Sequence, residues 1–210
     1  MKIWIVCSGQ ADLALPRRCT ARELARWCRQ EAEAPWRVQP VQTVPSAGRM
    51  VYVSPRRAAR ESARAFCGQG EYQTEPLLDE IPLAPFKEDK RPRPLWLWRL
   101  MARLQRRFGR KGQPESRRQA MERAEALIRK LESAGQDCVL VTHPAFLAVL
   151  LDRLRVHGYC SQRSGFGRLA PLERILCTRR EIHCGGCGHN CLLSNPGCAI
   201  GKDKARRQRG

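Results

Sequence analysis

The stretch Lys2–Gln10, KIWIVCSGQ, decides the fold. Its first half, IWIV, is a short, continuous apolar run, which is typical of a buried strand in a parallel sheet. Cys7, Ser8 and Gly9 follow at the carboxyl end of this strand. Open α/β sheets bind ligands at that edge, so these three residues are candidates for a functional site.

Two later stretches repeat the pattern of an apolar strand followed by a helix. Met50–Val53 is the second apolar run, and Ser54 with the proline after it predicts a helix that begins there with the serine as its N-cap. Asp137–Thr142 is the third run, and His143 ends it before a helix over 145–154. Alternating strands and helices predict a three-layer α/β/α domain with a mostly parallel sheet.

Further helix and strand signals complete this domain. Thr20 and Glu23 have the spacing of a capping box, so the first helix is expected to begin after Thr20. Apolar side chains recur at helical spacing over 115–133, and Gly135 ends that helix. Residues 169–178 predict one more strand.

An inserted segment, 84–114, contains a basic amphipathic helix over 95–108. We expect its apolar face to pack on the main domain as a cover over the strand-end pocket, and the alternative is a membrane surface contacted through Trp96 and Trp98. The apolar face is predicted to comprise Leu97, Leu100, Met101, Leu104 and Phe108.

The composition is strongly basic, with 39 Lys and Arg against 20 Asp and Glu and a formal net charge of +19. This charge favours anionic partners: a phosphorylated or other anionic small molecule, nucleic acid, or an acidic membrane surface. The apolar runs are too short for a signal peptide or a membrane span, so a cytoplasmic location is expected.

Four cysteines cluster near the end of the chain, in the stretch HCGGCGHNCLLSNPGCAIG over 183–201. Their spacing, C-x2-C-x3-C-x6-C, predicts a short cysteine-rich metal-binding loop within a tail over 179–201, followed by a basic disordered end over 202–210. Because all four lie in one loop, a [4Fe–4S] cluster is favoured over zinc, although His183 or His189 could replace one cysteine at a zinc site. The predicted ligands are Cys184, Cys187, Cys191 and Cys198.

The three strand-end motifs, IVCSG, VSPRRAARESA and VTHPAFLAVLL, share an order and spacing with a known family. Together with LDE at 78–80 and PES at 114–116, they resemble the histidine phosphatase superfamily, which has the phosphoglycerate-mutase-like fold, over residues 1–178. The resemblance implies a histidine nucleophile after the first strand, two arginines and a second histidine on the phosphoryl oxygens, and a carboxylic acid that protonates the leaving oxygen.

Position by position, this chain departs from that pattern. Ser8 stands where the resemblance places the nucleophile, and Cys7 and Ala58 stand at its two arginine positions, whereas His143 is kept. Glu80 and Glu115 match acidic positions. The candidate catalytic residues are Ser8, His143, Cys7 and Glu80, and the candidate ligand-binding residues are Gly9, Ser54 and Arg57.

The sequence therefore predicts a degenerate histidine-phosphatase-like protein without phosphohistidine catalysis, which binds a phosphorylated or anionic ligand in a regulatory role and carries a metal centre of four cysteines. Two alternatives stay open. One is an active phosphatase or hydrolase in which Cys7 or Ser8 acts with His143. The other is an iron–sulfur redox protein centred on the tail.

Overall fold

The computed structural model describes residues 1–35, 43–108, 112–161 and 173–179. All of them belong to one unit, Met1–Arg180, and the remainder of the chain, 181–210, is a separate unit that lies outside the described residues. The four tail cysteines and the basic end fall in that remainder, so their predicted roles stay predictions.

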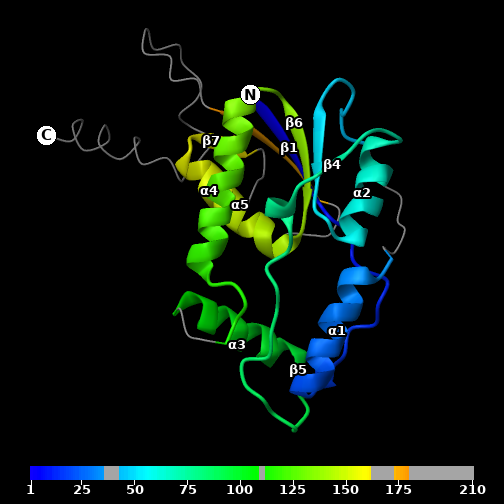
Figure 1. Ribbon diagram of the computed structural model, residues 1–210, viewed down its shortest axis with the longest axis vertical. Helices are drawn as coiled ribbons and strands as arrows, with labels where there is room; N and C mark the ends of the chain where they lie inside the picture. Colours follow the sequence, from blue (N-terminus) through cyan, green and yellow to red (C-terminus); the bar gives the residue numbers. More distant parts are fainter. Residues whose placement is uncertain (36–42, 109–111, 162–172, 180–210) are drawn as a thin grey trace, which may run out of the picture. The chain divides into compact units, whose positions relative to one another are not determined.

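The centre of the described unit is a six-stranded sheet (Figure 1). β1, β3, β4 and β6 run parallel to one another, β8 runs antiparallel to β1, and β7 runs antiparallel to β8. The predicted mostly parallel α/β fold is thus confirmed. In spatial order the strands are β4 (Gln73–Thr74), β3 (Met50–Val53), β6 (Cys138–Thr142), β1 (Lys2–Cys7), β8 (Arg174–Arg179) and β7 (Tyr159–Ser161).

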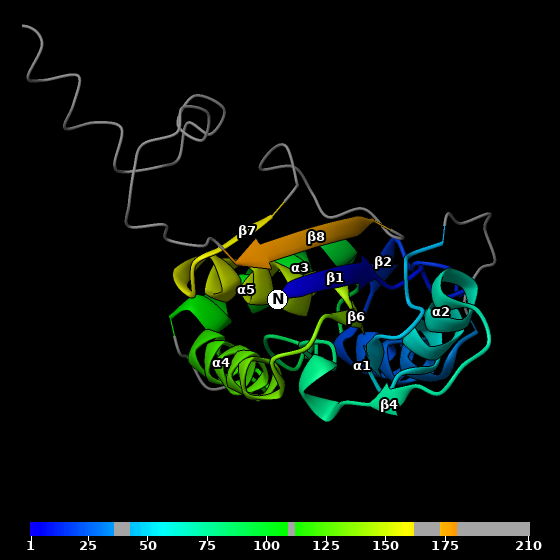
Figure 2. The same cartoon turned by 90° about the horizontal axis from the view of Figure 1, so that it is seen from above.

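Helices cover both faces of this sheet, as Figures 1 and 2 show. On one face Ile5 and Leu140 pack with residues of α4 and α5, and on the other Val6 and Val141 pack with residues of α2. Both sides of the central strands are therefore buried, which explains their continuous apolar sequences. The helices are α1 (Ala21–Glu33), α2 (Arg57–Cys67), η1 (a 3₁₀ turn, Pro76–Leu78), α3 (Leu95–Arg107), α4 (Arg117–Ala134) and α5 (Pro144–Val156).

The predicted helix ends follow their local signals in α1 and α4. Thr20 and Glu23 make both hydrogen bonds of a capping box at the start of α1. Gly135 ends α4 with φ 64°, a left-handed conformation that glycine adopts without a steric penalty. Among the described residues, no helix has both the length and the apolar character that crossing a membrane requires.

The start of α2 differs from the prediction. The helix begins at Arg57, and its N-cap is Arg56, which has extended backbone angles of φ −68° and ψ 144° and no side-chain cap bond. The prediction of Ser54 as the N-cap was wrong, because its hydroxyl is engaged by His143 from another strand end.

The buried face of α3 also differs from the prediction. Leu95, Trp98 and Ala102 are buried, and Leu95 and Trp98 pack with Cys19 of β2 (Arg18–Cys19) and Leu24 of α1. Trp98 Nε1 donates a hydrogen bond of 3.0 Å to the Cys19 carbonyl, beside the point where β2 pairs with β5 (Arg93–Pro94). The expectation that Leu100, Leu104 and Phe108 face the domain was wrong, since all three are exposed.

Candidate functional site

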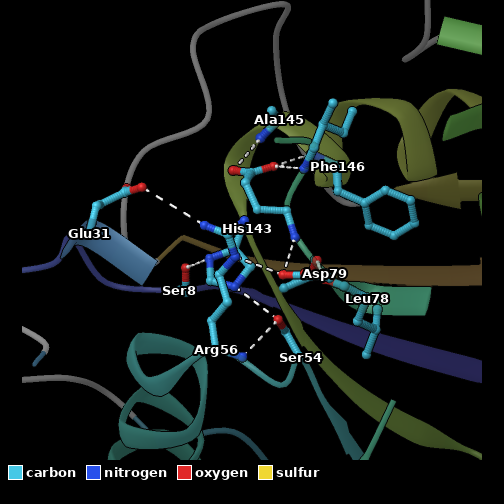
Figure 3. Close-up of polar contacts among 12 residues, drawn as sticks. Ser8, Glu31, Ser54, Arg56, Leu78, Asp79, His143, Ala145 and Phe146 are labelled. Atoms are coloured by element: carbon cyan, nitrogen blue, oxygen red, sulfur yellow. Dashed lines mark hydrogen bonds and ion pairs between the residues drawn. The ribbon is translucent and has the colours of Figure 1, made fainter. Parts of the chain in front are cut away.

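The centre of the site is the imidazole of His143, which lies between two serine hydroxyls (Figure 3). Its Nδ1 is 2.8 Å from Ser8 Oγ, and its Nε2 is 3.0 Å from Ser54 Oγ. All three side chains are almost fully buried, with exposed fractions of 6% for His143, 2% for Ser8 and 0% for Ser54. The strand ends thus bring these three predicted residues into direct contact.

The order of the strands explains this convergence. β6 lies between β1 and β3, so the residue after β6 is flanked by the residues that follow its two neighbours. The sheet's hydrogen bonding continues one step beyond the strands: the Ser8 amide donates to the Thr142 carbonyl at 2.7 Å, and the Ser54 amide donates to the Val141 carbonyl at 3.1 Å. Backbone pairing therefore fixes the spacing of the Ser8–His143–Ser54 network.

The imidazole of His143 is neutral at physiological pH. Its burial lowers its pKa from 6.5 to about 3, and the nearby Arg56 cation acts in the same direction while Asp79 opposes it. In a neutral imidazole one ring nitrogen donates and the other accepts. One of the two serines therefore donates to His143, and the other accepts from it.

Arg56 is a site residue that the sequence analysis missed. Its Nε donates to Asp79 Oδ1 at 2.7 Å, its Nη1 lies 3.8 Å from Glu31 Oε2, and its backbone amide donates to Ser54 Oγ at 3.4 Å. Figure 3 shows its side chain beside Ser54 and Asp79. Arg56 could have been found from its position two residues after a serine at a strand end. It was missed because the sequence analysis placed it inside a helix that begins at Ser54.

Arg57 and Ala58, the two residues of α2 that follow Arg56, take no part in the Ser8–His143–Ser54 network. Arg57, the predicted ligand-binding arginine, has a side chain that is 50% exposed and donates to Glu61 at 2.8 Å along the helix. Ala58, at the arginine position of the resemblance, is buried. Cys7, at the other arginine position, is also fully buried and belongs to the same core cluster as Ile3 and Ile5.

The loop after β1 is tied to α2 through Gly9. The Gly9 amide donates to the buried hydroxyl of Ser62 at 2.9 Å, and that hydroxyl in turn donates to the Ala58 carbonyl at 2.7 Å. The predicted ligand-binding residue Gly9 therefore has its amide directed at α2.

Glu80, the predicted acid, caps the start of α5. Its Oε2 accepts from the Ala145 amide at 3.2 Å, and its Oε1 accepts from the amides of Phe146 at 3.0 Å and Ile81 at 2.8 Å. Burial raises the pKa of this carboxyl, while these backbone hydrogen bonds and Arg56 oppose the rise. His143 itself provides no side-chain cap for α5, so Glu80 satisfies the free amides of that helix.

Glu115, the other acidic candidate, is engaged by Arg123. The two side chains form paired hydrogen bonds of 2.9 Å, and Arg123 Nη1 also donates to the carbonyls of Leu77 and Asp79. Arg123 lies 4.1 Å from the centre of the Phe146 ring. This arginine fixes the segment that carries Asp79 and Glu80.

The sequence matches a family model over most of the described unit: the model of the histidine phosphatase superfamily (branch 1) covers residues 9–163. The chain belongs to the histidine phosphatase superfamily. His143 lies within the matched residues, and Ser8 directly precedes them. The Ser8–His143–Ser54 network thus lies at the ends of three neighbouring strands of this domain.

Solved structures with a similar fold include two phosphatases. A mutant of phosphoserine phosphatase from Entamoeba histolytica, in complex with phosphoserine, is 16% identical, with 74% of this chain and 80% of that chain covered and a TM-score of 0.45. Mycobacterial glucosyl-3-phosphoglycerate phosphatase is 18% identical, with coverages of 73% and 78% and a TM-score of 0.45. No curated protein matches this chain.

Proposed function

We propose that this protein is a superfamily member without phosphohistidine catalysis, which binds a phosphorylated or other anionic ligand at the strand-end site and acts as a regulator. The observation that carries the proposal is the pairing of Ser8 with a neutral, buried His143. A serine hydroxyl needs a base to become a nucleophile, and an imidazole with a pKa of about 3 is a weak base at neutral pH. Cys7 offers no replacement, because its side chain faces the core.

Anion binding is supported by Arg56 and the two serines. Arg56 is held beside Ser54, and its charge acts on His143. The serine that accepts from His143 keeps its own hydroxyl proton and can donate it to a ligand's oxygen atom, and a guanidinium is well suited to carboxylate and phosphate groups. Asp79 and Glu31 already offset part of the Arg56 charge, so we expect the site to bind a singly charged group better than a dianion.

We expect no turnover of p-nitrophenyl phosphate and no phosphoenzyme when the protein is incubated with a ³²P-labelled phosphoester, since the residues that form and stabilise a phosphohistidine are absent from positions 7, 8 and 58. An active superfamily member assayed in parallel is the control. A stable phosphoenzyme that disappears in Ser8→Ala or Cys7→Ala would contradict the proposal and favour a hydrolase.

Anion binding at the same site is expected to depend on Arg56 and not on Arg57. Arg56→Gln should weaken the binding of inorganic phosphate, measured by calorimetry, by about tenfold or more, because a charge-assisted hydrogen bond contributes roughly 1.5–3 kcal/mol. Arg57→Gln removes the same charge one residue away, from an exposed side chain paired with Glu61, and is the matched control. Equal losses in both variants would show that only net charge matters.

The tail adds a metal centre to this proposal. Four thiolates within one short loop suit iron–sulfur clusters and zinc, which are the usual partners of clustered cysteines. One continuous loop is closer to the way ferredoxin-type sequences bind a cluster than to the separated ligand pairs of structural zinc sites, so a [4Fe–4S] cluster is our first assignment.

A further inference from the structure

One helix of the domain exposes a continuous row of apolar side chains. Trp96, Leu100, Leu104 and Phe108 have exposed fractions of 64%, 44%, 38% and 68%. They follow each other at intervals of four residues, so they lie along the same side of α3. These four, which we name the Trp96 row, are a majority of the seven large apolar side chains that the described residues expose, which makes their clustering the feature to explain.

Arginines are interleaved with this row. Arg103 and Arg107 are exposed, and they lie three residues after Leu100 and Leu104. Neither forms an ion pair with any residue that the structure describes, and α3 contains no acidic residue that could balance them. The exposed side of α3 is therefore both apolar and cationic.

The row is not needed to hold α3 in place. The opposite side of the helix carries the buried residues Trp98 and Ala102. Polar contacts add to this attachment: Gln105 Nε2 donates to the Phe86 carbonyl at 2.8 Å, and Arg106 Nη2 donates to the Pro82 carbonyl at 2.9 Å. The domain thus presents the row on a helix that other contacts already hold in place, and Figure 1 shows the position of α3.

We propose that the Trp96 row docks this protein on the surface of an anionic lipid bilayer. A helix that lies in the bilayer interface inserts aromatic and leucine side chains at the level of the headgroups and is attracted by its arginines to anionic lipids. Tryptophan at one end of the row suits the interface, where an apolar ring and a polar N–H are both accommodated. The complementarity of charge, strengthened by the net charge of +19, selects an anionic surface as the occupant.

Nucleic acid fits the same charge less well. Binding to nucleic acid is dominated by phosphate contacts, which the arginines could supply. It would leave the four apolar side chains in water, whereas a bilayer takes the apolar row out of water while its anionic headgroups attract the arginines. This proposal concerns a surface apart from the Ser8–His143–Ser54 network and does not depend on the ligand of that site.

The test is co-sedimentation of the full-length protein with vesicles. We expect it to bind vesicles of phosphatidylcholine with phosphatidylglycerol, to bind pure phosphatidylcholine weakly, and to dissociate as salt rises. Trp96→Ser with Phe108→Ser should weaken binding at least tenfold, whereas Leu15→Ser with Val156→Ser, which alters two exposed apolar residues elsewhere, should have little effect.

The contribution of charge is tested by a second matched pair. Arg103→Gln with Arg107→Gln should weaken binding about thirtyfold, since each basic residue near an anionic surface strengthens binding roughly fivefold. Arg60→Gln with Arg64→Gln removes the same charge from the exposed side of α2 and should leave most of the affinity. Circular dichroism of each variant confirms that the fold is kept.

Insertion itself is measured by quenching of tryptophan fluorescence with brominated lipids. Quenching of the folded protein on anionic vesicles should fall in Trp96→Phe while co-sedimentation is retained. Equal losses of binding in the α2 and α3 arginine variants, or unchanged binding in the Trp96 and Phe108 variant, would overturn the proposal and leave a general attraction between opposite charges. Self-association that is abolished by the same apolar substitutions would also overturn it, in favour of a second copy of the chain.

Discussion

Acidification from pH 7 to pH 4 is expected to destabilise the described domain by roughly 3 kcal/mol through His143 alone. The reason is that burial and the Arg56 cation lower the pKa of this imidazole from 6.5 to about 3 in the folded protein. Above about pH 6.5 the histidine is neutral in both states and adds no pH dependence. Below that value the unfolded chain binds a proton that the folded protein does not, so the free energy of unfolding falls by about 1.4 kcal/mol per pH unit.

Two measurements check this expectation. Urea unfolding at pH 7, 5.5 and 4.5 should give a steeper decline for the natural chain than for His143→Gln, which keeps polar contacts but has no ionisable ring. An NMR titration of the ring nitrogens, assigned with the same variant, should show His143 still neutral at pH 5. A histidine signal that titrates near 6.5 and is lost in His143→Gln would contradict the environment described for the site.

The other large effect is expected in the cysteine-rich tail. Anaerobically purified protein should contain one metal centre per chain, and Cys187→Ser with Cys191→Ser should remove it, because ligation by four thiolates cannot survive the loss of two. Apparent binding free energies of clustered thiolate sites reach about 10–16 kcal/mol at neutral pH, and such loops fold only with their metal. Protease cleavage between 183 and 201 should therefore accelerate in the variant.

Metal analysis and the absorption spectrum of the same preparation provide the readout. Iron with inorganic sulfide would support the [4Fe–4S] assignment. Zinc would support a metal site at the four cysteines but would contradict its assignment as an iron–sulfur cluster. Cys28→Ser with Cys160→Ser is the matched control, because both cysteines belong to the described domain and neither is part of the motif. Unchanged metal content and unchanged protease resistance in the Cys187 and Cys191 variant would end the hypothesis of a metal site.

Local signals were enough to predict most of the fold. The apolar runs at 3–6, 50–53 and 138–142 form strands that are buried on both faces of the sheet apart from the exposed Met50, and the capping box at Thr20 is made of residues three apart. The convergence of Ser8, His143 and Ser54 could also be predicted, since strand ends of a parallel sheet meet at one edge. β7 was missed, because Tyr159–Ser161 is a three-residue edge strand with little sequence signal of its own.

The errors arose where a distant residue overrides a local preference. Ser54 and the proline after it have the local form of a helix start, but His143, 89 positions away, engages the serine hydroxyl. The helix then starts later, and Arg56 takes an extended conformation beside the site. No residue within a few positions of Ser54 encodes this outcome.

The error in α3 has a different cause. This helix has apolar residues on more than one side, so its period alone does not select a buried face. Trp98 determines the buried face, because its large ring is fully buried with Leu24 and its N–H donates to the Cys19 carbonyl. A carbonyl 79 positions away in the sequence thus determines which side of α3 faces water.

In the Ser8–His143–Ser54 network the direction of hydrogen-bond donation can reverse. When Nδ1–H donates to Ser8, the Ser8 proton is free to be given outward, and Ser54 must give its own proton to Nε2. In the opposite tautomer Ser8 can only accept from outside, and the Ser54 proton is released toward the neighbourhood of Arg56. A ligand oxyanion at Ser8 selects the first tautomer of His143, and a ligand that donates a hydrogen bond to Ser8 selects the second. The tautomer in turn decides where the Ser54 proton points, so the chemistry of the ligand at Ser8 changes the hydrogen bonding at the start of α2 without a shift of the backbone.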